Sequence, residues 1–139
     1  MIALALLITA LGCSPTADWC DEASATHRVE PDYPVLAAGF GMTAVCRVRY
    51  DIDDTGHPEN LCVRCATGLE SPVPERAQAI AARQFVQFTE VAVGQWVYAP
   101  EYFNRAGVRT HINFLLEDQT EALLPDPPDM GECLGPQTS

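Results

Sequence analysis

Lysine is absent from this 139-residue chain, and eight arginines stand against 19 acidic residues, which gives a net charge of −11. A nucleic-acid-binding protein needs a basic face to hold phosphates, so the composition excludes that class. The same shortage disfavours attraction to an anionic membrane surface. The imbalance is strongest at the C-terminal end. No arginine follows Arg109, whereas six acidic residues do: Glu117, Asp118, Glu121, Asp126, Asp129 and Glu132.

A long hydrophobic run is also missing. Ile2 to Leu11 is apolar except for Thr9, and about ten residues are too few to span a hydrocarbon core as a helix. A run of this length is typical of a signal-peptide core. We therefore expect residues 1–13 to be a signal segment, followed by a tether over residues 14–30.

The end of the apolar run resembles the lipobox of bacterial lipoproteins, in which the cysteine becomes the acylated first mature residue. Ala10-Leu11-Gly12-Cys13 carries the resemblance, although Ala10 replaces the usual leucine and no lysine or arginine precedes the run. It implies lipidation at Cys13 and a periplasmic chain anchored to a membrane. Ser14 next to the cysteine resembles the outer-membrane sorting class. A plain secreted form and a buried helix are the alternatives.

Six cysteines in a short chain with a signal segment indicate disulfides rather than catalytic thiols. Counting outward from a turn near Gly56 brings Cys46 close to Cys65. Cys20 and Cys133 flank the domain and would tie its two tails together. A Cys62–Cys65 pair competes with these, and lipidation of Cys13 would leave an odd number. The connectivity stays open, because pairing cannot be deduced from sequence.

Hydrophobic periodicity predicts two strands, a helix and a last strand. Residues 44–52 alternate, with Cys46, Val48, Tyr50 and Ile52 on the buried face. Leu61 and Val63 return after the turn. Glu75 to Gln95 carries apolar residues at spacings of three and four, and Pro100 ends any continuation. In the last strand, from Thr110 to Leu116, Ile112, Phe114 and Leu116 would face the core.

Several of these residues also form an ordered set of motifs. They are Tyr33-Pro34 with Ala37, the alternating strand before Gly56, Phe85 eleven residues before Trp96-x-Tyr98-x-Pro100, and the last strand. In this set residues 31–117 resemble the C-terminal domain of the TonB energy-transducer family. The resemblance implies an α+β fold: a small antiparallel three-stranded sheet packed on one main helix.

The departures from the family concern function more than fold. Ala44 replaces a glycine, Thr55 replaces the turn aspartate, and Ala38 stands where a glutamine lies near the receptor contact. About a dozen extra residues precede Phe85. The transmembrane helix and the long proline-rich spacer of a full transducer are not found in this sequence, so we expect binding without energy transduction.

The family pairs its last strand with a short segment of outer-membrane receptors. The resemblance therefore implies strand addition to an exposed sheet edge, with a protein partner in the envelope such as a TonB-dependent receptor. The implied partner contacts are Arg109, His111, Asn113 and Leu115, with Tyr33 and Pro34 nearby. A merely solvated face is the alternative for these side chains. No enzyme activity, cofactor, metal or nucleic acid is expected.

Two other function classes stay open. Cys62-Val63-Arg64-Cys65 has the spacing of a redox or zinc motif, and His57 would be a third ligand, so a small redox or metal-binding envelope protein is one alternative. A purely structural lipoprotein is the other. The acidic, proline-rich tail from 118 to 139 is expected to be disordered.

Overall fold

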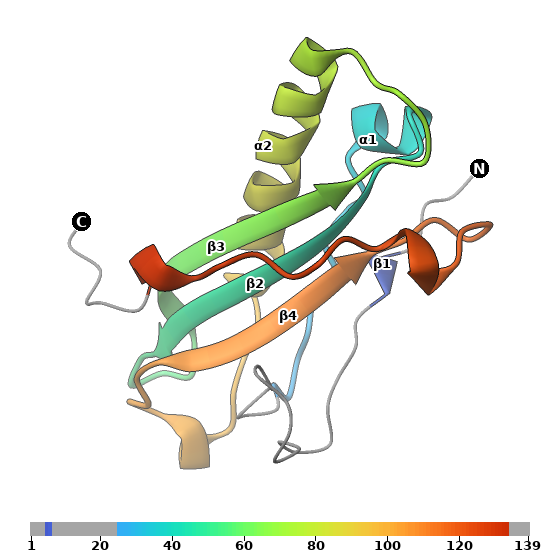
Figure 1. Ribbon diagram of the computed structural model, residues 1–139. Helices are drawn as coiled ribbons and strands as arrows, with labels where there is room; N and C mark the ends of the chain where they lie inside the picture. The colour runs from blue at the N-terminus through green and yellow to red at the C-terminus, as the bar shows by residue number, and fades with distance from the viewer. Residues whose placement is uncertain (1–4, 7–24, 134–139) are drawn as a thin grey trace.

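The computed structural model describes residues 5–6, by their backbone, and residues 25–133. Three antiparallel strands dominate it: β2 (Thr43–Ile52), β3 (Pro58–Gly68) and β4 (Val108–Phe114). The strand order is β1-β4-β2-β3, in which β1 (Ala5–Leu6) is a two-residue strand at the outer edge of β4. The predicted α+β class is confirmed, since one main helix accompanies this sheet (Figure 1).

The β2–β3 hairpin follows the predicted alternation. Cys46, Val48, Tyr50 and Ile52 are each at most 1% exposed, and they face the helix side of the sheet. Their neighbours in the sequence occupy the other face, because successive strand residues alternate. The connection between the strands is tight, and Gly56 adopts a φ of +90° there. The predicted turn position is thus confirmed.

Helix α2 (Glu75–Val93) covers one face of the sheet and ends close to the predicted boundary. It begins directly after Pro74, which suits a helix start because the first turn needs no N–H donor. Ala81, Phe85 and Thr89 lie on its buried face, at spacings of four residues. No helix in the described part of the chain is long and apolar enough to cross a membrane.

Aromatic rings form the centre of the core. Phe85 of α2 packs edge-on against Phe114 of β4, with ring centroids 4.9 Å apart. Tyr33 contacts both rings edge-on, at 5.8 Å and 5.6 Å. Such pairs add about 0.5–1.5 kcal/mol each beyond the burial of their area. Trp96, 1% exposed, closes the core after α2. The predicted helix, last strand and closing motif therefore meet in one cluster.

Short elements connect these parts. Helix α1 (Val35–Gly39) is a single turn after Pro34. A 3-10 helix, η1 (Pro100–Tyr102), leads from the closing motif toward β4. Two further 3-10 helices, η2 (Glu121–Leu123) and η3 (Gly131–Cys133), lie in the C-terminal segment.

The predicted tether is docked onto the domain over its last residues. The backbone N–H of Thr26 donates to the Val97 carbonyl at 2.8 Å, and Val97 N–H donates to the His27 carbonyl at 3.0 Å. The Trp96 indole N–H donates to the Val29 carbonyl at 2.9 Å. The folded unit therefore begins before residue 31, because the closing motif at Trp96 and Val97 needs these partners.

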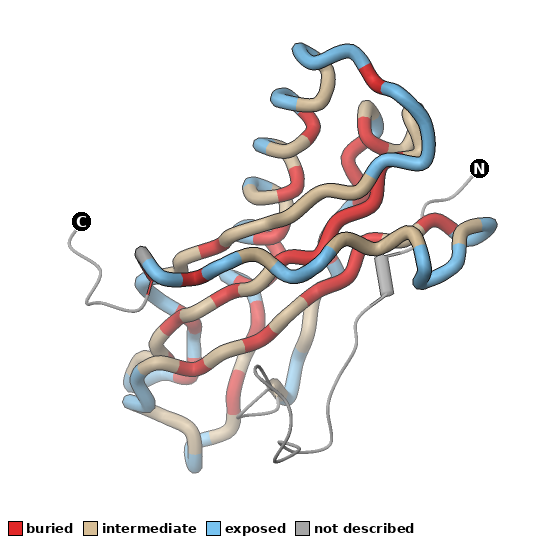
Figure 2. Tube along the Cα trace, in the orientation of Figure 1, coloured by how far each residue is buried: buried red, intermediate tan, exposed pale blue. Residues whose placement is uncertain are grey.

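The C-terminal segment also departs from the prediction. Residues 117–133, which we name the strap, run back across the sheet face opposite α2 (Figures 1 and 2). Met130 and Cys133 are buried, at 4% and 0% exposure. The expectation of disorder is wrong for residues 118–133, because a disulfide and hydrogen bonds to β2 hold them. Residues 134–139 lie outside the described part of the chain.

Candidate interaction site

The outer edge of β4 is the feature that most resembles a docking site. On one side β4 pairs with β2 along its whole length. On the other side the described residues supply only β1, with Ala5 opposite Phe114 and Leu6 opposite Asn113 in antiparallel register. Within the described chain, the backbone of residues 108–112 therefore has no strand neighbour on that side. Unpaired main-chain groups of this kind accept an extended segment.

The predicted contact residues of β4 lie together on the sheet face that the strap covers. By register Arg109 is opposite Arg49, His111 opposite Arg47 and Asn113 opposite Val45. Arg109, His111 and Leu115 are half-buried. Asn113 is only 7% exposed, although it was expected to face outward. The outward direction was correct, but its exposure was not, because the strap packs over this end of β4.

Tyr33 and Pro34 do not lie on a contact surface. Tyr33 is 8% exposed, and its hydroxyl donates a hydrogen bond to the Met42 carbonyl. Burial raises the pKa of this hydroxyl well above its ordinary value. Pro34 is buried as well. Neither side chain offers exposed surface to a partner in this structure, and the ring of Tyr33 is a core element that joins α2 to β4.

The face beneath the strap is rich in arginine. Cross-strand register puts Arg64 opposite Arg47 and Arg109 opposite Arg49, so four of the eight arginines share this face. Arg47 Nη1 donates to the Pro128 carbonyl at 3.1 Å, and Arg49 Nη1 donates to the Cys133 carbonyl at 3.0 Å. Sequence reasoning missed this surface. The alternation of arginines in β2, together with an acidic segment later in the chain, was the available signal.

The strap is also held close to the sheet at its first half. Thr43 Oγ1 donates to the Leu123 carbonyl at 2.7 Å, and the Gln119 amide donates to the Gly41 carbonyl at 2.9 Å. Gly68 makes this approach possible, because a Cβ there would lie 2.6 Å from the Leu123 carbonyl oxygen. Further along, Leu124, Pro125 and Pro127 line a pocket with four residues of the sheet, Val45, Arg47, His111 and Asn113.

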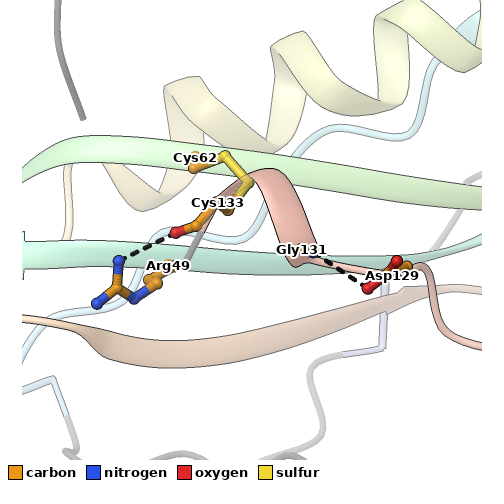
Figure 3. The surroundings of a disulfide bond; sticks show 5 residues. All are labelled: Arg49, Cys62, Asp129, Gly131 and Cys133. Atoms are coloured by element: carbon orange, nitrogen blue, oxygen red, sulfur yellow. Dashed lines mark hydrogen bonds between the residues drawn. A yellow bond between two sulfur atoms is a disulfide. The ribbon is translucent and has the colours of Figure 1, made fainter. Parts of the chain in front are cut away.

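The disulfides answer part of the cysteine question. Cys46 is bonded to Cys65, its direct partner in the β2–β3 register, as hairpin counting predicted. Cys133 is bonded to Cys62 (Figure 3), with Cα atoms 5.8 Å apart, and not to Cys20. The path of the strap explains this correction, since it brings Cys133 back over β3. Cys13 and Cys20 lie outside the described residues.

This connectivity removes the main support for a redox or metal site. Cys62 and Cys65 belong to two different bridges, so the Cys-x-x-Cys motif neither closes on itself nor offers two thiolates. His57 instead lies in the hairpin turn, where its Nδ1 is 2.9 Å from Thr55 Oγ1. Within residues 25–133 no group of three or more histidine, cysteine or acidic side chains is placed to hold a metal ion.

Asp53 of the turn has a structural role. The Asp53 carboxylate accepts hydrogen bonds from the backbone N–H of His57 at 2.9 Å, from the Thr55 hydroxyl at 2.7 Å and from the Thr55 backbone N–H at 2.8 Å. These bonds, led by the one from His57, lower the pKa of Asp53 to about 2. The side chain closes its own turn, as aspartate commonly does.

Comparison with known proteins adds little to what the structure itself shows about the fold. No protein-family model matches the chain, and no curated protein matches it. Among solved structures, the TonB2 protein of Vibrio anguillarum is similar with a TM-score of 0.44 at 21% sequence identity. The match covers 80% of this chain and 97% of that one. The fold class therefore rests on the strand order and registers of the chain itself.

Proposed function

We propose that this chain is an exported interaction module that binds an extended segment of an envelope protein by strand addition to β4. The observation that supports this most strongly is the pairing of β1 with β4. An extended segment already occupies the end of that edge in antiparallel register, whereas residues 108–112 have no strand on the same side within the described chain. Main-chain hydrogen bonds along the edge would supply affinity, and side chains of alternate residues would supply specificity.

The opposite edge of the sheet is a poorer acceptor. Between Arg49 and Asp51 the β2–β3 register shifts, because β3 carries an extra residue there. Asn60 within this bulge has a φ of +54°. Bulges of this kind twist an edge and protect it from further pairing. β4 pairs with β2 without any such shift, so its edge is the straighter template.

Export is part of the same proposal. Residues 1–13 would direct the chain across the inner membrane, and Cys13 would carry the lipid that anchors it in the periplasm, at the outer membrane. Removal of this signal segment would also remove Ala5 and Leu6 from β4. The mature chain would then present the β4 edge over its full length, at the location where envelope partners are found.

Site-specific photo-crosslinking tests the proposal. A photo-reactive amino acid is placed at Arg109, and in a control at Gln87, an exposed position of α2. Both chains are produced in the bacterium that encodes them, irradiated and analysed by mass spectrometry. We expect position 109 to crosslink to one extended segment of an envelope protein and position 87 to give no such adduct. Equal crosslinking at both positions, or none at position 109, would contradict the proposal.

A purely structural lipoprotein is the remaining alternative. The two disulfides and the docked strap agree with it, because each stabilises a small domain. It predicts no specific crosslink from β4, so the same experiment separates the two functions.

A further inference from the structure

Three hydrogen bonds join side chains of β2 to the backbone of the strap. Arg47 and Arg49 donate to main-chain carbonyls, of Pro128 and Cys133, rather than to particular side chains in these two bonds. Thr43 likewise donates to a carbonyl, that of Leu123. A segment with prolines keeps its carbonyls available, since proline donates no hydrogen bond. These three bonds therefore depend on the extended backbone of the strap and not on the identity of its side chains.

Charge and shape narrow the kind of segment further. Four arginines occupy the face, and the strap that covers it carries six acidic residues and no basic one. Leu124, Pro125 and Pro127 line a pocket of about 250 Å³ with Val45 and His111, among other residues of the sheet. A segment that binds this face would thus be acidic overall, with a few apolar or proline residues that fill the pocket over β2 and β4.

The strap is fastened at its end by a disulfide between half-buried Cys62 and buried Cys133. Cys62 is half-buried and lines a groove of about 500 Å³ between β3 and α2, in which Arg64 and Arg83 also lie. Nearby guanidinium groups favour a thiolate, and access governs the rate of thiol–disulfide exchange. In the second bridge Cys46 has no exposed surface, although Cys65 borders the same groove. Cys133 has no exposed surface either, so the two bridges differ in what must open to expose them. Cys133 lies in the short 3-10 helix at the end of the strap, whereas Cys46 lies on β2, which is paired on both sides. Opening the end of the strap takes less unfolding than opening the sheet, so Cys62–Cys133 is the bridge that a reductant reaches first.

We propose that the strap is a redox-released cover, and that the face beneath it binds an acidic, proline-containing extended segment of a partner protein. A dithiol reductant would reduce Cys62–Cys133 to two thiols and would itself be oxidised to a disulfide. Two electrons and two protons thus pass from the reductant to the protein. The released strap then leaves the arginines of β2, and the partner segment binds to them in its place. This face adjoins the β4 edge, since Arg109 borders both, but the inference does not depend on strand addition.

Release of the strap is tested in the full chain by mild reduction and alkylation. We expect Cys62 and Cys133 to be alkylated at least about tenfold faster than Cys46 and Cys65, because opening the end of the strap takes less unfolding than opening β2. Amide hydrogen exchange should then rise in residues 119–130 while β2 stays protected. Loss of both bridges at one rate, or unchanged exchange in the strap after reduction of Cys62–Cys133, would overturn the redox cover.

A glycine pair tests the same release without removing a cysteine. Gly68→Ala would push a methyl group against the Leu123 carbonyl, whereas Gly39→Ala meets nothing within 4 Å. We expect the Cys62–Cys133 bond of Gly68→Ala to be reduced about tenfold faster than that of the native chain, with Gly39→Ala unchanged. Equal rates of Cys62–Cys133 reduction in the two variants would contradict a strap whose packing protects its own disulfide.

Disulfide trapping tests the binding face. The Cys133→Ser variant keeps Cys62 on the face, and a synthetic peptide with the sequence of residues 117–133 serves as the probe in a glutathione redox buffer. A scrambled peptide that retains the terminal cysteine is the control. We expect at least about tenfold more mixed disulfide with the authentic peptide, and loss of that preference when Arg47 and Arg49 are both replaced by alanine.

The trapping experiment has two contrary outcomes. Equal trapping of both peptides by a variant that retains the near-ultraviolet signal of buried Trp96 would overturn the binding face. If the native chain, reduced and reoxidised at the same concentration, forms Cys62–Cys133 bridges between two copies, the occupant is a second copy and the partner assignment fails. Should Cys133→Ser not fold, the glycine pair still decides whether the strap is a releasable cover.

Discussion

Tyr33 packs edge-on against Phe114, with ring centroids 5.6 Å apart, and so connects the segment before α1 to the last strand of the sheet. The Tyr33 hydroxyl already has a hydrogen-bond partner, since it donates to the Met42 carbonyl. A Tyr-Pro step that the sequence placed near a partner is thus part of the core. The surfaces left for binding are the β4 edge and the face beneath the strap.

The aromatic cluster makes the first prediction. Phe85 has no exposed surface and contacts both Tyr33 and Phe114. Phe85→Ala should lower the free energy of unfolding by about 3–5 kcal/mol, because it removes buried area and leaves a cavity. Val91→Ala, at a position 64% exposed on the same helix, should change it by less than about 0.5 kcal/mol. Urea unfolding measures both, and similar losses would contradict the assigned helix face.

The second prediction concerns the turn between β2 and β3. Gly56 has a φ of +90°, and a Cβ there would lie 2.5 Å from the Tyr98 carbonyl oxygen. Gly56→Ala should therefore cost about 2 kcal/mol or more, through backbone strain and steric overlap. Gly39→Ala, in open space at the end of α1, should be neutral or stabilising by up to about 1 kcal/mol. Thermal unfolding of the two variants compares them directly, and a tolerant position 56 would refute the turn geometry.

The third prediction concerns pH. The pKa of Asp53 is lowered to about 2, below its ordinary value of 3.8, chiefly by the backbone N–H of His57. A depressed carboxyl pKa stabilises the folded state above the unfolded-state value and loses this effect as pH falls through the folded-state value. Stability should therefore decline between about pH 4 and pH 2, and Asp53→Asn should decline less over that interval. A carboxyl titration by NMR with a midpoint near 4 would contradict this.

Local patterns predicted the fold well because they record which face of each element is buried. Period-two alternation with Gly56 gave the β2–β3 register and hence Cys46–Cys65. Spacings of three and four gave α2. The buried state of Asn113 was not predictable in this way, since it depends on a segment that returns from later in the chain.

The strap shows most clearly what sequence patterns leave out. Its prolines and acidic residues have the composition of a disordered tail, and composition does not reveal an arginine-lined face that will hold it. Cys133 had several possible partners by counting alone, and only the path across β2 and β3 selects Cys62. Long-range contacts of this kind determine which face of the sheet is covered. The strand order determines which edge of the sheet is open.

Amide hydrogen exchange along β4 tests the central claim most directly. The chain is compared alone and with a synthetic peptide of the envelope segment that crosslinks to position 109. Because outward main-chain groups alternate along an edge strand, we predict that the peptide slows exchange at alternate amides of residues 108–112 and leaves α2 unchanged. Unaltered exchange in β4, or protection confined to α2 or to β3, would contradict strand addition at this edge.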